Sequence, residues 1–173
     1  MPTLHVCSLA RLHETVAATG ASHVVTLINQ GTPVECPSCI ERSRHLVIGV
    51  SDIVEPLEGH ILPAEEHVDT LLRFVRTWDR DNPLVIHCFA GISRSTAAAF
   101  ISACAMVPEH NEAEIARALR QASPSATPNP RLIAIADEML GREGRMIDAV
   151  RRIGRGAEAF EGAPFTLRIA ELP

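Results

Sequence analysis

The stretch HCFAGISRS, residues 87–95, joins two segments of opposite character. The apolar run PLVI that precedes it, residues 83–86, is typical of a strand buried on both faces of a sheet. The alanine-rich run that follows, up to about Met106, is rich in good helix formers. We therefore expect a strand, a tight loop and the N-terminus of a helix, with Cys88 and Arg94 six positions apart in this unit.

The rest of the chain alternates strand-like and helical patterns. Short apolar, β-branched runs predict strands at residues 3–9, 22–29, 44–52 and 84–87. Helical spacing of apolar residues, together with caps and Gly or Pro stops, predicts helices at about residues 10–19, 68–78, 93–106, 111–122 and 129–140. This alternation predicts an α/β fold, with a central, mostly parallel sheet of about four to five strands flanked by helices.

The length of 173 residues fits a single domain with a substantial core. We expect residues 1–173 to form that domain, with its core at about residues 3–141 and a C-terminal extension at 142–173. The extension contains one short amphipathic stretch and a strand-like FTLRI, residues 165–169, and its sequence does not define a role.

Charge and composition exclude several classes of protein. The net charge is −5 at pH 7, so no global basic field attracts nucleic acid or anionic lipid. The N-terminus lacks the basic and apolar regions of a secretory signal, and no run approaches the ~18 apolar residues of a membrane span. The five cysteines form no regular disulfide framework, which favours a reducing compartment. We expect a cytoplasmic protein without a nucleic-acid or membrane partner; the sequence does not define its oligomeric state.

The unit around residues 87–95 has the features of an anion site. A glycine-containing loop that opens a helix points backbone N–H groups and the positive end of the helix dipole at one place. Arg94 adds a planar fork suited to two oxygens of a phosphate-like group. Cys88 lies in the same field, which stabilises a thiolate able to attack phosphorus in line. The arginine and the loop amides would then stabilise the equatorial oxygens of the transition state.

The other loop residues have supporting roles in this hypothesis. Gly91 permits a positive φ and a close approach of the backbone to the ligand. Ser95 donates a hydrogen bond to the sulfur, which improves it as a leaving group, and His87 orders the loop by hydrogen bonding. The alternative to an anion site is a loop without a functional role, in which a buried cysteine follows a strand and an exposed arginine begins a helix. The expected phosphate-binding residues are Phe89, Ala90, Gly91, Ile92, Ser93 and Arg94.

HCFAGISRS closely resembles the signature loop of the cysteine-dependent protein tyrosine phosphatases, above all the compact dual-specificity branch in a bacterial-type form. The resemblance spans about residues 45–140 and includes ASPSATPNPRL, residues 122–132, which resembles the segment those enzymes carry before their final helix. It implies a dual-specificity phosphatase-like fold. It also implies hydrolysis of phosphate monoesters through a cysteinyl-phosphate on Cys88, with Arg94 holding the phosphate and with no metal or cofactor.

The resemblance further implies an aspartate upstream of the nucleophile, acting first as general acid and then as general base. Asp52, directly after the third predicted strand, stands in that place; ordinary turn chemistry is its alternative role. It lies further from Cys88 than is usual in the compact enzymes, and the loop IVEPLEGHILP, residues 53–63, looks like an insertion that accounts for the excess. Glu58 is the rival candidate, followed by Glu55.

Three functions are compatible with this loop. By resemblance, the substrate is a protein carrying phosphotyrosine or phosphoserine/threonine. The first alternative is a small-molecule phosphate monoester, such as an inositol phosphate or a nucleotide; the absence of basic residues from FAGIS, residues 89–93, argues against it. The second is a phosphate-binding module without turnover, and the intact Cys88 and Arg94 argue against that.

A second cysteine motif, CPSC, lies at residues 36–39. The spacing of Cys36 and Cys39 suits a redox pair or half of a zinc site. Prolines bracket the pair, and it does not open a helix after a strand. We interpret it as an incidental pair in a loop, with reversible disulfide formation as the alternative.

Overall fold

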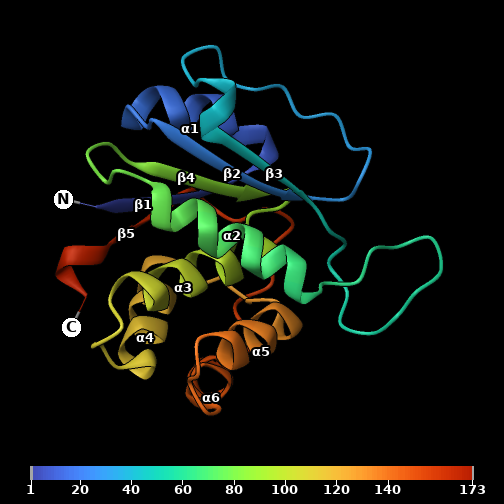
Figure 1. Cartoon of the computed structure of the whole chain (residues 1–173), viewed down its shortest axis with the longest axis vertical. Helices are drawn as coiled ribbons and strands as arrows, with labels where there is room; N and C mark the ends of the chain where they lie inside the picture. The colour runs from blue at the N-terminus through green and yellow to red at the C-terminus, as the bar shows by residue number, and fades with distance from the viewer. Residues whose placement is uncertain (1, 173) are drawn as a thin grey trace.

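The computed structural model describes residues 2–172, and at its centre lies a five-stranded sheet of order β3-β2-β4-β1-β5 (Figure 1). Four of its strands are parallel: β1 (Thr3–Ser8), β2 (His23–Ile28), β3 (His45–Gly49) and β4 (Leu84–Cys88). At one edge, β5 (Phe165–Arg168) pairs antiparallel with β1. The predicted α/β fold with a mostly parallel sheet is therefore confirmed.

Helices cover both faces of the sheet (Figure 1). One face carries α1 (Leu12–Thr19), which follows a 3-10 turn at Leu9–Arg11 and packs on β1 and β4. Two other 3-10 turns, at Arg42–Arg44 and Ile169–Glu171, precede β3 and follow β5. The opposite face carries α2 (Glu65–Thr77), α3 (Arg94–Met106), α4 (Glu112–Ala122), α5 (Pro130–Met139) and α6 (Arg145–Ile153).

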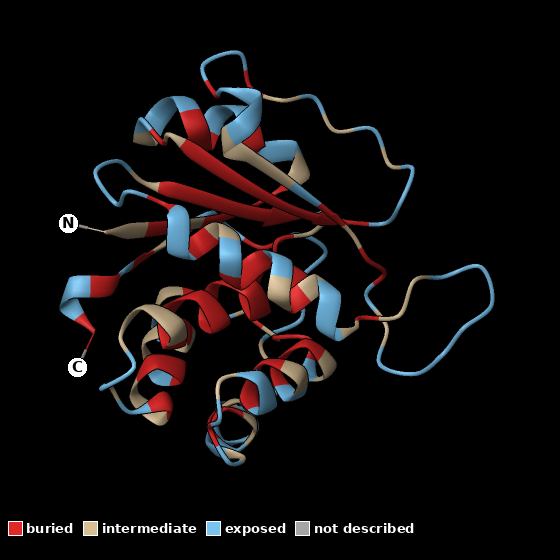
Figure 2. Ribbon diagram, viewed as in Figure 1, coloured by how far each residue is buried: buried red, intermediate tan, exposed pale blue. Residues whose placement is uncertain are grey.

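The core is built around α3, which lies against the middle of the sheet. Its side chains are buried from Arg94 to Cys104, and many of them are alanines, so α2, α4 and α5 pack closely around it. The strands β2 and β4 are buried along their whole length (Figure 2). This packing holds the end of β4 and the start of α3 in a fixed relation, and Cys88 and Arg94 lie at that junction.

Residues 142–172 contribute to the same core. The helix α6 packs against α4 and α5, and Asp137 of α5 caps its start by accepting hydrogen bonds from the N–H groups of Gly144 (2.7 Å) and Met146 (2.8 Å). The side chains of Phe165 and Leu167 on β5 are buried. Between α6 and β5, residues 154–164 bond to residues 124–127 through Gly156 and Ala157 and to the loop after β4 through Gly162, and we call them the C-terminal strap.

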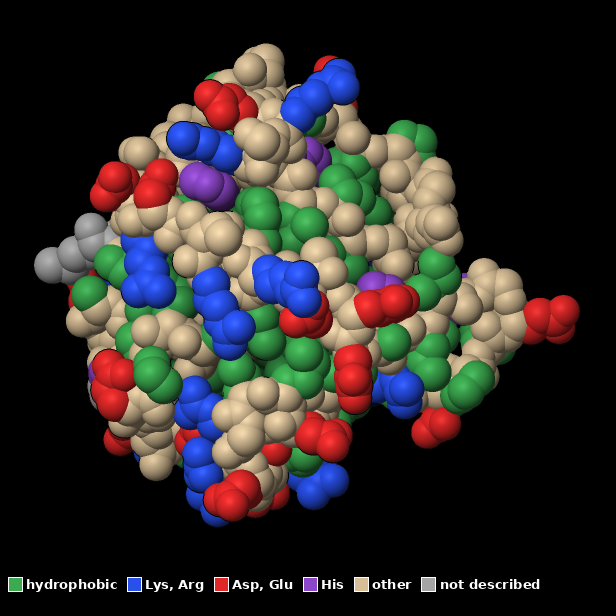
Figure 3. Space-filling view, in the orientation of Figure 1, with side chains coloured by type: hydrophobic (Ala, Val, Ile, Leu, Met, Phe, Trp, Pro, Cys, Tyr) green, Lys and Arg blue, Asp and Glu red, His purple; other side chains and the backbone are tan. Residues whose placement is uncertain are grey.

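The surface carries both signs of charge. Basic and acidic side chains are interspersed on the face seen in Figure 3. The segment between β3 and α2 extends from the body as a long loop whose residues 54–60 are exposed (Figure 2). Among residues 2–172, no helix has both the length and the apolar character that a membrane crossing requires.

Candidate active site

The carboxyl ends of the four parallel strands meet at one edge of the sheet. Ser8 and Cys88, the last residues of β1 and β4, are partners in the strand register. Asn29 and Val50 follow directly after β2 and β3. In open α/β sheets, ligands bind in the crevice beyond these ends. Cys88 therefore stands where the fold favours a binding site.

The loop after β4 turns its carbonyl groups outward. Four of them accept backbone hydrogen bonds of 2.8 to 3.2 Å from neighbouring segments: Phe89 from Leu9, Ala90 from Gly162, Ile92 from Thr127 and Ser93 from Asn129. In a planar trans peptide, the carbonyl and the following N–H point in opposite directions. The N–H groups of Ala90, Gly91, Ser93 and Arg94 therefore face the inside of the loop. Such a concave set of amides is suited to an anion.

Cys88 lies at the bottom of this loop and is only 2% exposed. Its Sγ is 3.2 Å from the backbone N of Gly91, which donates to it, and 3.1 Å from the Ser95 hydroxyl. The N-cap of α3, Ser93, does not use its side chain to cap the helix. The positive end of the α3 dipole therefore remains open to an anion beside the sulfur.

Arg94 is held by the ends of two strands. Its Nη1 donates to Asn29 Oδ1 (2.7 Å) and to the Val50 carbonyl (2.9 Å), and the residue is 7% exposed. Its Nε is buried and has no hydrogen-bond partner within residues 2–172. Buried polar groups in folded proteins are nearly always paired, so this N–H is available to an acceptor from outside the chain.

The turn at Gly91 brings the loop against β1. Its φ is +73°, in the region that favours glycine. A Cβ at this position would lie 2.8 Å from the carbonyl carbon of Cys7 and 2.9 Å from the backbone nitrogen of Ser8. A side chain here would therefore push the loop away from the sheet, and only glycine allows the inward amides to close around the sulfur.

His87 anchors the end of β4 through a chain of hydrogen bonds. Its Nδ1 is 3.1 Å from the Cys88 carbonyl oxygen and its Nε2 is 2.6 Å from Thr26 Oγ1, which is 2.8 Å from His45 Nε2. Because a carbonyl only accepts, Nδ1 carries the proton; Nε2 then accepts from Thr26, and Thr26 accepts from His45. Burial lowers the pKa of His87 to about 4. The neutral ring is therefore a fixed hydrogen-bonding group near pH 7.

Asp52 reaches the loop from the end of β3. Its Oδ1 accepts hydrogen bonds from the Ser93 hydroxyl (2.7 Å) and from Asn129 Nδ2 (2.8 Å). Glu55 and Glu58 are exposed on the extended loop, and neither side chain has a hydrogen bond or ion pair within residues 2–172. Of the three carboxylates weighed from the sequence, only Asp52 is tied to the loop residues.

The other cysteines differ from Cys88 in their surroundings. Burial raises the pKa of Cys7 to about 11 and that of Cys104 to about 12, so both are neutral thiols near pH 7. Cys36 and Cys39 are free, and the Cys36 thiol donates to the carbonyls of its own loop. Within residues 2–172, no three His, Cys, Asp or Glu side chains are grouped to hold a metal ion.

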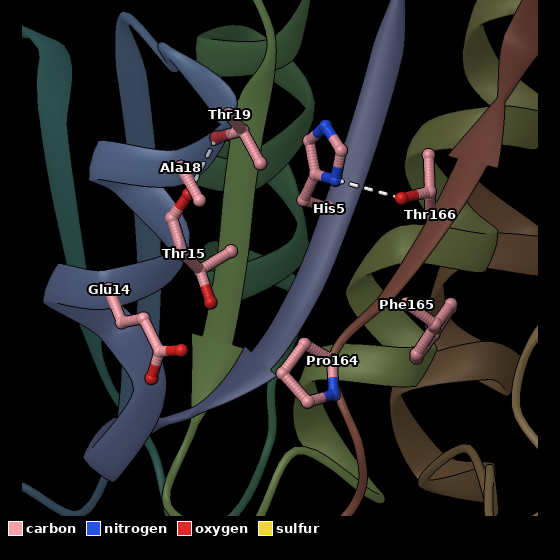
Figure 4. Close-up of a pocket in the computed structure, with 8 residues that line it drawn as sticks. All are labelled: His5, Glu14, Thr15, Ala18, Thr19, Pro164, Phe165 and Thr166. Carbon is pink, nitrogen blue, oxygen red and sulfur yellow. Dashed lines mark hydrogen bonds between the residues drawn. The ribbon is translucent and has the colours of Figure 1, made fainter.

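A hollow of about 270 Å³ lies elsewhere, between α1 and β5 (Figure 4). Inside it, His5 Nδ1 and Thr166 Oγ1 are 2.9 Å apart, and the Thr19 hydroxyl donates to the Thr15 carbonyl (2.7 Å). None of residues 87–95 lines this hollow. It is separate from the candidate site.

Comparison with known families bears on this site directly. The model of the family described as protein-tyrosine phosphatase matches residues 58–128, which include the whole loop after β4. Over this segment the chain is similar to the protein-tyrosine phosphatases. It is accordingly a cysteine-dependent phosphatase. No curated protein sequence matches the chain.

Solved structures share the fold. DUSP15 aligns with a TM-score of 0.65 and 20% identity, over 88% of this chain and 91% of that one. Human DUSP28 aligns with a TM-score of 0.60 and 19% identity, over 81% and 89%. PTPMT1 in complex with PI(5)P aligns with a TM-score of 0.58 and 13% identity, over 87% and 94%. At these identities the likeness concerns the fold, which is that of the compact dual-specificity phosphatases.

Some contacts of this phosphatase loop were not predicted from the sequence. Asn29 is the last residue of the strand predicted at 22–29, and its bond to Arg94 joins residues far apart in the chain. Asn129 is the first residue of the helix predicted at 129–140; it caps α5, and its Nδ2 also donates to Asp52. Gly162 lies in the extension, and nothing local indicates that its N–H bonds to the loop. A polar residue just after a strand was the available signal for Asn29.

We predict that His87 makes this phosphatase less stable in acid. The ring gains a proton near pH 6.5 in the unfolded chain but only near pH 4 in the fold, so the folded state binds fewer protons in between. The stabilisation is complete above about pH 6.5 and is lost as the pH falls towards about 4, a change of about 3 kcal/mol. In urea denaturation across this pH range, His87→Gln should show a shallower decline than wild type.

The exposed His60 provides the control, because His60→Gln also removes one imidazole and His60 is not among the groups that lower the pKa of His87. Its unfolding free energy should fall with pH as steeply as that of wild type. Equal slopes for wild type and His87→Gln would contradict the role assigned to the buried neutral ring.

Proposed function

We propose that this phosphatase acts on phosphorylated protein side chains, with Cys88 as the nucleophile and Arg94 as the main phosphate-binding side chain. The observation that carries the proposal is the buried, unpartnered Nε of Arg94. Because Asn29 and Val50 already fix the guanidinium, its free N–H is held ready for an oxygen of an anion. Cys88 lies at the bottom of the same loop, with its sulfur within hydrogen-bonding distance of an inward amide.

In the proposed complex, residues 89–94 surround the phosphate. Its oxygens accept hydrogen bonds from the inward amides and from Arg94. The α3 dipole adds partial positive charge at the same place. These groups need no rearrangement during the reaction, so they stabilise the charge on the equatorial oxygens as the transition state forms.

In the first step, the Cys88 thiolate attacks phosphorus and the bond from phosphorus to the leaving oxygen breaks. Asp52, entering the step protonated, donates its proton to that oxygen. The hydrogen bonds from Ser93 and Asn129 both go to Oδ1, which leaves Oδ2 to carry the proton towards the substrate. The products of this step are the dephosphorylated side chain and a cysteinyl-phosphate.

In the second step, the Asp52 carboxylate takes a proton from a water molecule, and the resulting hydroxide attacks phosphorus. The sulfur–phosphorus bond breaks, and inorganic phosphate leaves. The Ser95 hydroxyl, 3.1 Å from the sulfur, stabilises the departing thiolate by hydrogen bonding. Each step thus uses a group already within reach of the loop.

The rim of the loop supports a protein substrate. Phe89 is 64% exposed, and Phe160 of the C-terminal strap is fully exposed. Such apolar side chains suit a surface that buries neighbouring residues of a substrate. A small-molecule phosphate is the alternative. The uncharged residues 89–93 offer no additional cation for a multiply phosphorylated ring.

We further propose that the chain works as one domain without metal or cofactor, in a reducing compartment such as the cytoplasm. A thiolate nucleophile must stay reduced, and all five cysteines are free. Residues 142–172 support the single-domain proposal by supplying a helix and an edge strand to the core. No partner beyond the phosphorylated substrate is needed for the chemistry.

We predict that Cys88→Ser lowers kcat for 4-nitrophenyl phosphate by about a thousandfold or more, because a hydroxyl cannot replace the thiolate. Arg94→Lys should cost on the order of a hundredfold, since a single ammonium cannot match the forked guanidinium. Vanadate should inhibit wild type and a chelator should not. Turnover that survives Cys88→Ser, or that a chelator abolishes, would overturn the mechanism.

For the general acid, we predict a loss that grows with the pKa of the leaving group. Asp52→Asn should lower kcat/KM for phenyl phosphate by about a hundredfold and that for a dinitrophenyl phosphate far less, because a good leaving group needs no proton. Glu58→Gln and Glu55→Gln are the matched controls and should follow wild type. If Glu58→Gln shows the leaving-group dependence instead, Glu58 is the acid.

A further inference from the structure

A groove of about 490 Å³ lies between the start of α5 and the end of α6. This volume falls within the ~300–1,000 Å³ of typical ligand sites. Two exposed arginines, Arg151 and Arg155, stand on its rim. Its walls are largely apolar and include Pro128, Ile133, Ala134, Ile147 and Val150. The groove thus combines an apolar floor with a cationic edge.

The groove adjoins the phosphatase loop. Thr127 lines the groove, and its backbone N–H donates to the Ile92 carbonyl (2.9 Å). Two residues later, Asn129 holds the carboxylate of Asp52. The segment 127–129 therefore forms a wall shared by the phosphate site and the groove. A chain extending from a phosphate over Cys88 can enter the groove by crossing this segment.

The charge of the groove contrasts with that of the protein. The chain as a whole carries a net charge of −5. Arg151 makes no side-chain hydrogen bond or ion pair within residues 2–172. The Arg155 guanidinium is 4.0 Å from Glu158, and both side chains are highly exposed, so this pair is weak. The rim is therefore complementary to a negative group that lies beside an apolar one.

We propose that this groove binds a segment of the phosphoprotein substrate that carries an apolar side chain next to an acidic one. The proposal rests on the proposed function, because it places the phosphorylated residue over Cys88. A peptide segment suits the site better than an anionic lipid surface. The net charge of −5 disfavours attachment of the whole protein to an anionic surface, whereas an acidic peptide side chain needs only the two arginines of the rim.

The test uses phosphotyrosine peptides in which a Leu-Glu pair is moved one position at a time away from the phosphorylated residue. Each is compared with a Ser-Lys peptide of the same register, and 4-nitrophenyl phosphate serves as a substrate too small to reach the groove. The groove variants are Arg151→Glu with Arg155→Glu, which reverses the rim, and Ala134→Trp, which fills the floor. Arg152→Glu is the matched control, because this exposed arginine of α6 lines a different hollow.

Wild type should favour Leu-Glu at one register. For that peptide, the rim variant should raise KM by about tenfold with little change in kcat, and Ala134→Trp by a similar factor. Arg152→Glu should match wild type, and all variants should hydrolyse 4-nitrophenyl phosphate at the wild-type rate. Binding of the same peptides to Cys88→Ser protein, measured by fluorescence anisotropy, should show the same differences without turnover.

The outcomes separate this inference from the proposed function. If wild type does not hydrolyse 4-nitrophenyl phosphate but peptide binding depends on the groove, the proposed function fails and the groove stands. If wild type is active and the groove variants treat all peptides as wild type does, the groove inference is wrong. It is equally wrong if Arg152→Glu causes the same loss, or if the groove variants impair hydrolysis only on phosphatidylinositol phosphate vesicles.

Discussion

The outward pairing of the loop carbonyls after β4 is the constraint on which the site depends. Four carbonyls point to neighbouring segments, those of Phe89, Ala90, Ile92 and Ser93. Because the peptide is planar and trans, the N–H that follows each carbonyl points the opposite way, towards Cys88. The arrangement places several N–H groups, a helix N-terminus and a guanidinium around one sulfur without any net positive charge on the protein. The positive electrostatic field at the sulfur therefore comes from the direction of nearby backbone dipoles and from one arginine, and not from the net charge of the protein.

The partners of these carbonyls come from distant parts of the chain, so the loop geometry is a property of the whole fold. Leu9 follows β1, Thr127 and Asn129 precede α5, and Gly162 belongs to the C-terminal strap. Arg94 adds the ends of β2 and β3 through its own hydrogen bonds. Through the N–H of Gly162, the extension therefore supports the loop of the candidate site.

Features that depend on neighbouring residues can be predicted from this sequence, whereas contacts that depend on packing cannot. The strand, the turn at Gly91 and the start of α3 follow from neighbouring residues, and the positive φ of Gly91 agrees with that interpretation. Asp52 was chosen by its place after a strand, and its carboxylate does contact Ser93. The contacts of Asn29 and Gly162 arise only when elements far apart in the chain come together, and no local pattern encodes them.

The central claim is that Cys88 carries the phosphoryl group between two chemical steps. Rapid chemical quench of the Asp52→Asn protein mixed with a phosphotyrosine peptide, followed by mass spectrometry of the fragment containing Cys88, tests it most directly. We predict a single phosphoryl adduct on Cys88 that appears before inorganic phosphate and decays as phosphate is released. Release of phosphate while this fragment stays unmodified, or an adduct on any other residue, would contradict the claim.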